Sequence, residues 1–362
     1  MAAAAEPVLG DGMKTMTVRP LVLGVALAAC ALALPQHARA DAKVVIGSVP
    51  GIAAAGTYIA DAKGYFREAG IDVEIANLAS AADAMASLST NQFQVVEGGY
   101  SAGYWNALTK NFPIITAFER GSRPTNHKIV VPPSLKDKIK AVADLKGHSV
   151  AVNAPGSLTI YELGKMLEAS GLTIKDVDVK YIPFPEMSVA LKNGAIDAAE
   201  DIPPFVNVGI EQGLMHVIGS IDDTLKPYPL GSIAYQINTD WAAKNQDVAR
   251  KFFVAIARGT RDYCQAYHHG PNRNEVLDIM IKYKVMSDRA LLDRIPWQGR
   301  DPNGRMDAGT VLDIQDWFFK EGMITKKFPA SRLIDTSYAD YVAKTLGPFK
   351  LINQSDPLPS CR

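Results

Sequence analysis

The chain lacks the features that direct a protein to nucleic acid, into a lipid bilayer or to a metal cofactor. Its 38 Lys and Arg residues balance 38 Asp and Glu residues, so no net field attracts nucleic acid or an acidic membrane surface. Beyond the N-terminus no apolar run is long enough to cross a bilayer. Only three cysteines occur, none in a close-spaced set with histidine, and the adjacent His268 and His269 would point to different sides of a helix. We therefore expect no metal site, no cofactor and no nucleic-acid partner.

The sequence also lacks common signatures of catalysis. It shows no Ser/His/Asp arrangement and no glycine-rich phosphate-binding motif. What it does contain is 362 residues with 48% hydrophobic content, enough for two domains with cores of their own. These observations favour a binding protein over an enzyme.

Residues 1–40 have the order of an export signal. Lys14 and Arg19 supply a basic segment, residues 21–34 are apolar, and a small Ala-Arg-Ala sequence ends at position 40. We therefore expect a mature protein that begins at Asp41 and lies in the periplasm.

One detail competes with simple cleavage. Residues 27–30 read Leu-Ala-Ala-Cys, which looks like a lipoprotein cleavage motif and would place a lipid anchor on Cys30. The apolar run continues past Cys30 to Leu34 and is followed by a good cleavage site, which favours the soluble form.

The two remaining cysteines are Cys264 and Cys361. In an exported protein a pair of cysteines more often forms a disulfide than a metal site, so we expect these two to be bonded. The alternative is a buried free thiol at Cys264 and an unpaired thiol in the tail.

Strands and helices alternate along the mature chain. Residues 44–47 form a β-branched run, residues 57–68 carry apolar side chains at helical spacing, and residues 71–75 alternate like a strand. Gly70 suits the end of the helix because glycine accepts a positive φ. The same order recurs downstream, which predicts an α/β fold with mostly parallel sheets flanked by helices.

The order of the elements suggests two lobes joined by two crossings, one near Lys128 and one near Ile233. We expect a discontinuous first lobe at 41–127 and 236–362, and a second lobe at 128–235. Such lobes can hinge, and a ligand bound between them favours the closed state.

Several segments resemble one family of exported proteins. Residues 62–75 read Ala-Lys-Gly-Tyr-Phe-Arg-Glu-Ala-Gly-Ile-Asp-Val-Glu-Ile, and similar landmarks lie at 142–147, 191–199, 301–307 and 321–324. In these segments the chain resembles periplasmic solute-binding proteins of the nitrate/sulfonate/taurine and thiamine-pyrimidine type. The resemblance implies a two-lobed, type II periplasmic binding protein fold with an interlobe ligand cleft. It also implies delivery of the solute to a membrane permease and its ATPase, and we expect a monomer.

Two strand-to-helix turns are the leading candidates for ligand contacts. They are Asn153, Gly156 and Ser157 in one turn, and Gly99, Tyr100 and Ser101 in the other. A serine at each helix start would cap the helix, and the N–H groups of a helix start suit an anion. The resemblance implies that the first turn lies at the cleft. The alternatives are an ordinary capped helix and a tyrosine of the core.

A loop of small residues before the first helix is a further candidate, because it either packs tightly or leaves room for a solute. Its candidate residues are Ala54, Ala55, Gly56 and Thr57. The resemblance favours a role in binding.

Three larger side chains complete the candidates. Asp201, next to Glu200, could hold an amine, a ring N–H or a hydroxyl, or the pair could form a solvated rim or a hinge salt bridge. Trp297 could stack on a flat solute or simply pack. Arg120 could pair with an acidic group of the solute, but we favour a role in stabilising the crossing.

Together these features predict the extracytoplasmic substrate-binding component of an ABC importer. Its solute would be a small organic acid, with sulfonates and aromatic or heterocyclic acids as candidates. One alternative is an enzyme of thiamine-pyrimidine-synthase type, although such enzymes need a lysine-bound cofactor and a cysteine-rich iron motif. Another is an exported binding protein that presents its solute to a membrane sensor.

Overall fold

The computed structural model describes residues 42–225, 231–358 and 360–362. The predicted signal peptide and Cys30 lie outside the described residues. None of the helices in the described part of the chain is both long and apolar enough to span a membrane.

The first sheet has the strand order β2-β1-β3-β10-β4. Strand β1 pairs in parallel with β2 and β3, whereas β10 runs antiparallel to both β3 and β4. Four strands therefore point one way and β10 points the other. The strands are β1 (Ala42–Ser48), β2 (Ile71–Asn77), β3 (Val95–Gly99), β4 (Ile114–Gly121) and β10 (Ile233–Asn238).

The second sheet repeats this plan with the order β7-β6-β8-β5-β9. Here β6 is parallel to β7 and β8, and β5 is antiparallel to β8 and β9. Its strands are β5 (Lys128–Val131), β6 (Ser149–Val152), β7 (Asp178–Tyr181), β8 (Ala198–Asp201) and β9 (His216–Ser220). The chain leaves the first sheet after β4 and returns to it with β10. The predicted class, an α/β fold with mostly parallel sheets flanked by helices, is confirmed, and one antiparallel strand makes each sheet mixed.

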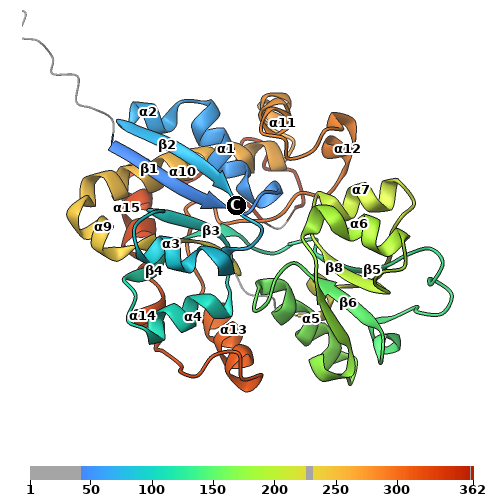
Figure 1. Cartoon of the computed structure of the whole chain (residues 1–362). Coiled ribbons are helices and arrows are strands. Elements are labelled where there is room, and N and C mark those ends of the chain that lie inside the picture. Colours follow the sequence, from blue (N-terminus) through green and yellow to red (C-terminus); the bar gives the residue numbers. More distant parts are fainter. Residues whose placement is uncertain (1–41, 226–230, 359) are drawn as a thin grey trace, which may run out of the picture. The chain divides into compact units, whose positions relative to one another are not determined.

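Helices flank both sheets (Figure 1). Those between strands of the first sheet are η1 (Ile52–Ala54), α1 (Ala55–Ala62), α2 (Tyr65–Glu68), η2 (Ala81–Ala84), α3 (Met85–Ser89) and α4 (Ala102–Thr109). Those between strands of the second sheet are η3 (Val142–Leu145), α5 (Leu158–Ala169), η4 (Ile174–Asp176), α6 (Phe184–Lys192) and α7 (Phe205–Glu211). Helix α8 (Ile221–Thr224) follows β9.

The C-terminal third is helical. It comprises α9 (Thr239–Lys244), α10 (Gln246–Tyr267), α11 (Arg273–Lys282), α12 (Arg289–Arg294), α13 (Ala308–Lys320), α14 (Ala330–Leu333) and α15 (Ser337–Leu346). Phe252, Phe253 and Ile256 of α10 are fully buried in one cluster with Val44 and Ile46 of β1, so this long helix covers the first sheet. The burial of such large side chains is the main source of stability here.

The single helix expected at residues 57–68 is wrong in one respect, because the structure divides it. Helix α1 ends at Ala62 and α2 begins at Tyr65, with Gly64 between them in the left-handed region at φ 75°. Glycine takes this conformation without steric cost, so it ends the first helix and turns the chain into the second.

The two cysteines among the described residues are joined. Cys264 of α10 and Cys361 form a disulfide with a Cα–Cα distance of 5.0 Å across 97 positions of sequence. Both residues are buried. The bond fixes the C-terminal segment against α10, next to Arg300, whose carbonyl accepts a hydrogen bond from the Cys361 N–H.

Candidate functional site

A pocket lies where loops of the two sheets meet, with about 520 Å³ of empty space that includes open solvent. Elements of the first sheet contribute Val49, Pro50, Gly51, Ala53, Ser80, Ala81, Gly99, Arg120 and Ile233. Elements of the second contribute His127, Asn153, Ser157, Leu158, Thr159, Phe184, Ile202 and Pro203, and Gln298 comes from the C-terminal region. Loops at the carboxyl ends of strands form most of this wall, which is where open α/β sheets bind their ligands.

The turn before α5 supplies a polar part of the wall. Ser157 occupies the N-cap position, but its side chain makes no capping hydrogen bond and instead contacts Thr159 Oγ1 at 2.9 Å. Thr159 donates to Asn153 Oδ1 at 2.8 Å, and Asn153 Nδ2 donates to the carbonyl of Ala79 at 3.0 Å. The start of this twelve-residue helix therefore lies beside the pocket without a capping hydrogen bond from the Ser157 side chain.

The turn at the end of β3 reaches the pocket only through Gly99. A Cβ atom added to Gly99 would lie 2.6 Å from Cβ of Leu158 at the start of α5, so the close approach of the two elements requires glycine. Tyr100 is fully buried, and its ring centroid lies 5.6 Å from those of Tyr104 and Trp105. Tyr100 is therefore a tyrosine of the core, and its ring does not line the pocket.

Ser101 and Gly156 also lie beside the pocket rather than in its lining. Ser101 is the N-cap residue of α4 without a capping hydrogen bond from its side chain, so the expected serine cap is absent here too. The N–H of Ala102 donates to the carbonyl of Gly156 at 2.8 Å. The two helix starts thus contact each other through the backbone.

The small-residue loop lines the pocket through Pro50, Gly51 and Ala53, and not through the four residues that the sequence analysis expected. Ala54, Ala55, Gly56 and Thr57 are buried in η1 and α1, and none of them lines the pocket. A Cβ atom on Gly56 would lie 2.8 Å from Oγ1 of Thr260, so Gly56 is small because α10 packs closely on α1. Thr57 donates to Glu97 Oε2 at 2.7 Å.

Arg120 is held in the pocket wall by a buried ion pair. Its Nε lies 3.2 Å from Oε2 of Glu97, and its Nη2 donates to the carbonyl of Val49 at 2.5 Å. The side chains of Arg120 and Glu97 are almost wholly inaccessible to solvent. Such a pair has little freedom to move, so it presents a fixed polar surface to the pocket.

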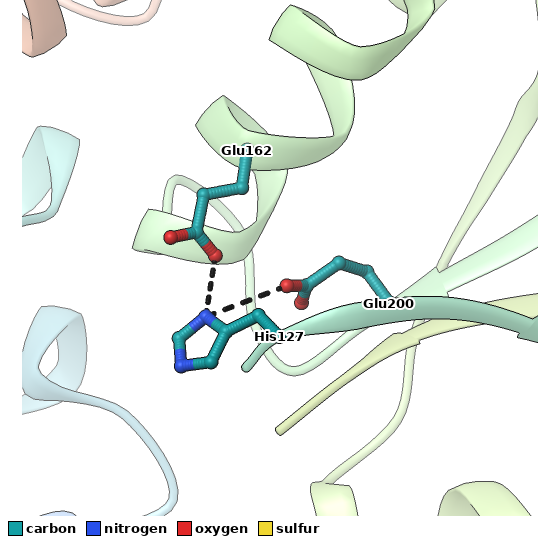
Figure 2. A group of neighbouring side chains, drawn as sticks. All are labelled: His127, Glu162 and Glu200. Carbon is teal, nitrogen blue, oxygen red and sulfur yellow. Dashed lines mark hydrogen bonds and ion pairs between the residues drawn. The ribbon is translucent and has the colours of Figure 1, made fainter. Parts of the chain in front are cut away.

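His127 lines the pocket and was missed by sequence reasoning. Its Nδ1 lies 2.7 Å from Glu162 Oε2 and 3.7 Å from Glu200 Oε1 (Figure 2). Its Nε2 lies 3.4 Å from the side-chain nitrogen of Gln298. The acidic pair at positions 200 and 201 was the one local signal that pointed to this region.

The acidic pair itself is fully buried, so the expectation of a solvated rim is wrong. Asp201 does not line the pocket, and its Oδ1 accepts a hydrogen bond from the N–H of Ile202 at 2.8 Å. Burial raises the pKa of Asp201 well above its ordinary value. The pKa of Glu200 is raised as well, by burial and then by the carboxylate of Glu162.

Trp297 lies away from the pocket. Its indole N–H donates to the carbonyl of Leu292 at 2.8 Å, and the guanidinium of Arg273 stacks on its ring at 4.4 Å. Of the two expected roles of Trp297, stacking on a solute or packing, the structure shows packing. The neighbouring Gln298 is the residue of this segment that reaches the pocket. Ligand binding by Gly99, Asn153 and Ser157, which do line the pocket together, stays a prediction.

Comparison with known proteins identifies one relative by sequence and several solved structures with the same fold. A Haemophilus influenzae protein named "Putative thiamine biosynthesis protein" is 25% identical over 307 residues, which cover 82% of this chain and 91% of that one. The Escherichia coli periplasmic aliphatic sulphonate binding protein SsuA shares the fold with a TM-score of 0.63 at 19% identity, covering 81% and 92% of the two chains. The nitrate-binding protein NrtA of Synechocystis gives a TM-score of 0.67 at 16% identity, with 84% and 89% covered.

The same fold occurs in an enzyme. The desulfurization enzyme DSZB matches with a TM-score of 0.56 at 12% identity, over 84% of this chain and 99% of that one. At such identities the solved structures show a common fold only.

The family follows from the sequence itself. The model of the NMT1/THI5-like family matches residues 52–267, a segment that runs from the start of η1 to the end of α10. The chain therefore belongs to the NMT1/THI5-like family and has the fold of the periplasmic binding proteins.

Proposed function

We propose that this protein is the extracytoplasmic solute-binding component of an ABC importer, and that its solute is a small organic acid held in the pocket described above. The observation that carries the proposal is the pocket itself, which combines an uncapped helix start with an apolar wall. Apolar side chains and a few polar groups line this pocket, as is usual for sites that bind small molecules.

The two sides of the pocket suit an acid with an apolar body. Leu158, Phe184 and Ile202 offer apolar contacts. The start of α5 and the side chains of Ser157 and Asn153 offer polar partners for an anionic group, which the partial positive charge of a helix N-terminus favours. Sulfonates and aromatic or heterocyclic carboxylates fit this description.

Capture and release follow from the position of the pocket between two sheets. We propose that the segments 41–127 and 236–362 form one lobe, that 128–235 form the other, and that the lobes hinge over the solute in the periplasm. The closed lobes would then present the solute to a membrane permease driven by its ATPase. A ligand closes such a protein only to the extent that it binds the closed state more tightly.

An enzymatic role is the competing function, and the names of the Haemophilus relative and of DSZB give it a basis. The binding role is supported better, because the named neighbours SsuA and NrtA are binding proteins. Genes for a permease and an ATPase beside the gene for this chain would favour the importer, whereas a receptor gene there would favour a sensor partner.

The direct test is a thermal-shift screen of small organic acids, followed by calorimetry with each hit. A ligand that binds only the folded state raises the transition temperature. Ser157→Phe fills the pocket beside the helix start and should weaken binding by at least 10-fold. Ser170→Phe, at the other end of α5, is the matched control and should leave affinity unchanged. Equal affinity in the wild type and in a folded Ser157→Phe variant would contradict the assignment of the pocket.

A further inference from the structure

Three side chains from three different elements converge beside the pocket (Figure 2). Glu162 comes from α5 and Glu200 from β8, and His127 directly precedes β5. Their potential ligand atoms all lie within 4.8 Å of one another, and all three residues are buried.

The register of the second sheet explains the convergence. Strand β5 pairs with β8 so that Ile129 lies opposite Glu200 and Lys128 opposite Asp201. Side chains alternate between the faces of a sheet, so His127 shares a face with Ile129 and is a diagonal neighbour of Glu200. Asp201 points to the opposite face.

Glu200 is the member of the cluster that the protein satisfies least. His127 contacts both carboxylates, at 2.7 Å and 3.7 Å, whereas neither oxygen of Glu200 has a hydrogen bond anywhere in residues 42–225, 231–358 and 360–362. A buried carboxylate without hydrogen bonds is costly. A cation between the three groups would remove this cost.

The spacing and the donor set suit a transition-metal ion. Metal–ligand distances of about 2.0–2.2 Å in tetrahedral geometry place neighbouring ligand atoms roughly 3.3–3.6 Å apart. The two distances from His127 Nδ1, 2.7 Å and 3.7 Å, lie on either side of that range. One imidazole nitrogen with two carboxylate oxygens is a ligand set of the kind that zinc takes, and the imidazole distinguishes it from the all-oxygen sites of magnesium and calcium.

We propose that His127, Glu162 and Glu200 bind a divalent transition-metal ion of the zinc type in the wall of the pocket. Two carboxylates neutralise the charge of the ion, and the neutral imidazole completes three protein ligands. Because His127 also lines the pocket, the site is part of the pocket wall. The proposal concerns the ion alone and holds whether or not the protein serves an importer.

The test uses the tag-free mature protein, stripped with chelator and titrated with zinc chloride by calorimetry. We expect one high-affinity ion per chain and a higher melting temperature with zinc than without it. Loss of an outer-sphere partner typically costs about 10–100-fold in metal affinity, so removal of a direct ligand in Glu200→Gln should cost on the order of 100-fold or more. His127→Gln should have a similar effect.

Asp201→Asn is the matched control, because Asp201 is the adjacent residue, is equally buried and lies on the other face of β8. It should bind zinc within about 3-fold of the wild type, since it removes no ligand. Zinc held elsewhere, for example by His269 and Asp356, whose side chains lie 2.9 Å apart, would be unaffected by all three variants. Absence of zinc binding in the wild type, or binding that persists unchanged in folded Glu200→Gln and His127→Gln, would overturn the proposal.

A second measurement covers variants that do not fold. Crystals of the wild type grown with zinc should show an anomalous peak at the zinc edge in contact with His127 and Glu200. An anomalous signal only at other positions would refute the site.

Discussion

Glu119 of β4 should make this protein less stable as the pH rises from 5 to 8. The residue is fully buried, one carboxylate oxygen accepts a hydrogen bond from the N–H of Asp301 at 3.0 Å, and the other has no partner among the described residues. Burial, and then the negative charge of Asp301, raise the pKa of Glu119 from 4.5 to about 8.

The direction of this pH dependence follows from the number of protons bound by the native and by the unfolded protein. Between pH 4.5 and 8 the native protein keeps the proton on Glu119 while the unfolded chain has lost it, so the free energy of unfolding falls as the pH rises. At about 1.4 kcal/mol per pH unit, the interval between the two pKa values corresponds to about 5 kcal/mol in total. Between pH 5 and pH 8 the loss is about 3 to 4 kcal/mol.

Glu119→Gln removes the titrating group and keeps its shape. We expect the variant to have nearly the wild-type stability at pH 5 and to exceed it by up to about 3 kcal/mol at pH 8, because only the wild type must then ionise a buried carboxyl or retain its proton at a cost. The assay is urea unfolding at several pH values, with Glu186→Gln on the exposed surface of α6 as control. A difference between variant and wild type that does not change with pH would refute the reasoning.

Three further outcomes follow from the structure. Replacing both Cys264 and Cys361 by alanine should lower the free energy of unfolding by about 2–5 kcal/mol in denaturant titrations, because the bond closes a long loop; an unchanged midpoint would contradict this. Gly99→Ala should reduce affinity for a confirmed solute several-fold by calorimetry, since its Cβ would meet Leu158, and equal affinity would exclude that contact from the closed state. Arg120→Met should destabilise the fold by about 3–5 kcal/mol by leaving a buried carboxylate unpaired, and a melting temperature equal to that of the wild type would disprove the pairing.

Much of the fold could be predicted from local sequence. The β-branched run at residues 44–47 became β1, the alternating segment at 71–75 became β2, and Gly70 lies between helix and strand with a positive φ of 71°. The periodicity of apolar side chains and the glycines that end helices are local features of a few residues. They can therefore be recognised without knowing which segments pack together in the fold. The division of the helix at Gly64 was not predicted, because the helical spacing of apolar residues continues across the break.

The lining of the pocket was predicted only in part. Gly99 ends a strand, Asn153 follows one and Ser157 directly precedes a helix, and strand ends are where sequence reasoning places ligands. Tyr100 and Trp297 belong to the core instead, because the space available to a large ring depends on what packs against it and not on its neighbours in sequence.

The sequence by itself determined the class of fold, the strand-to-helix turns and the family, since these depend on local pattern. The tertiary structure alone decided that His127, Glu162 and Glu200 meet. His127 and Glu162 are 35 positions apart, and only the pairing of β5 with β8 and the packing of α5 over that sheet bring the three groups together. The same is true of the buried pair of Arg120 and Glu97. Strand register and helix packing set these contacts, and one sequence read along its length does not contain them.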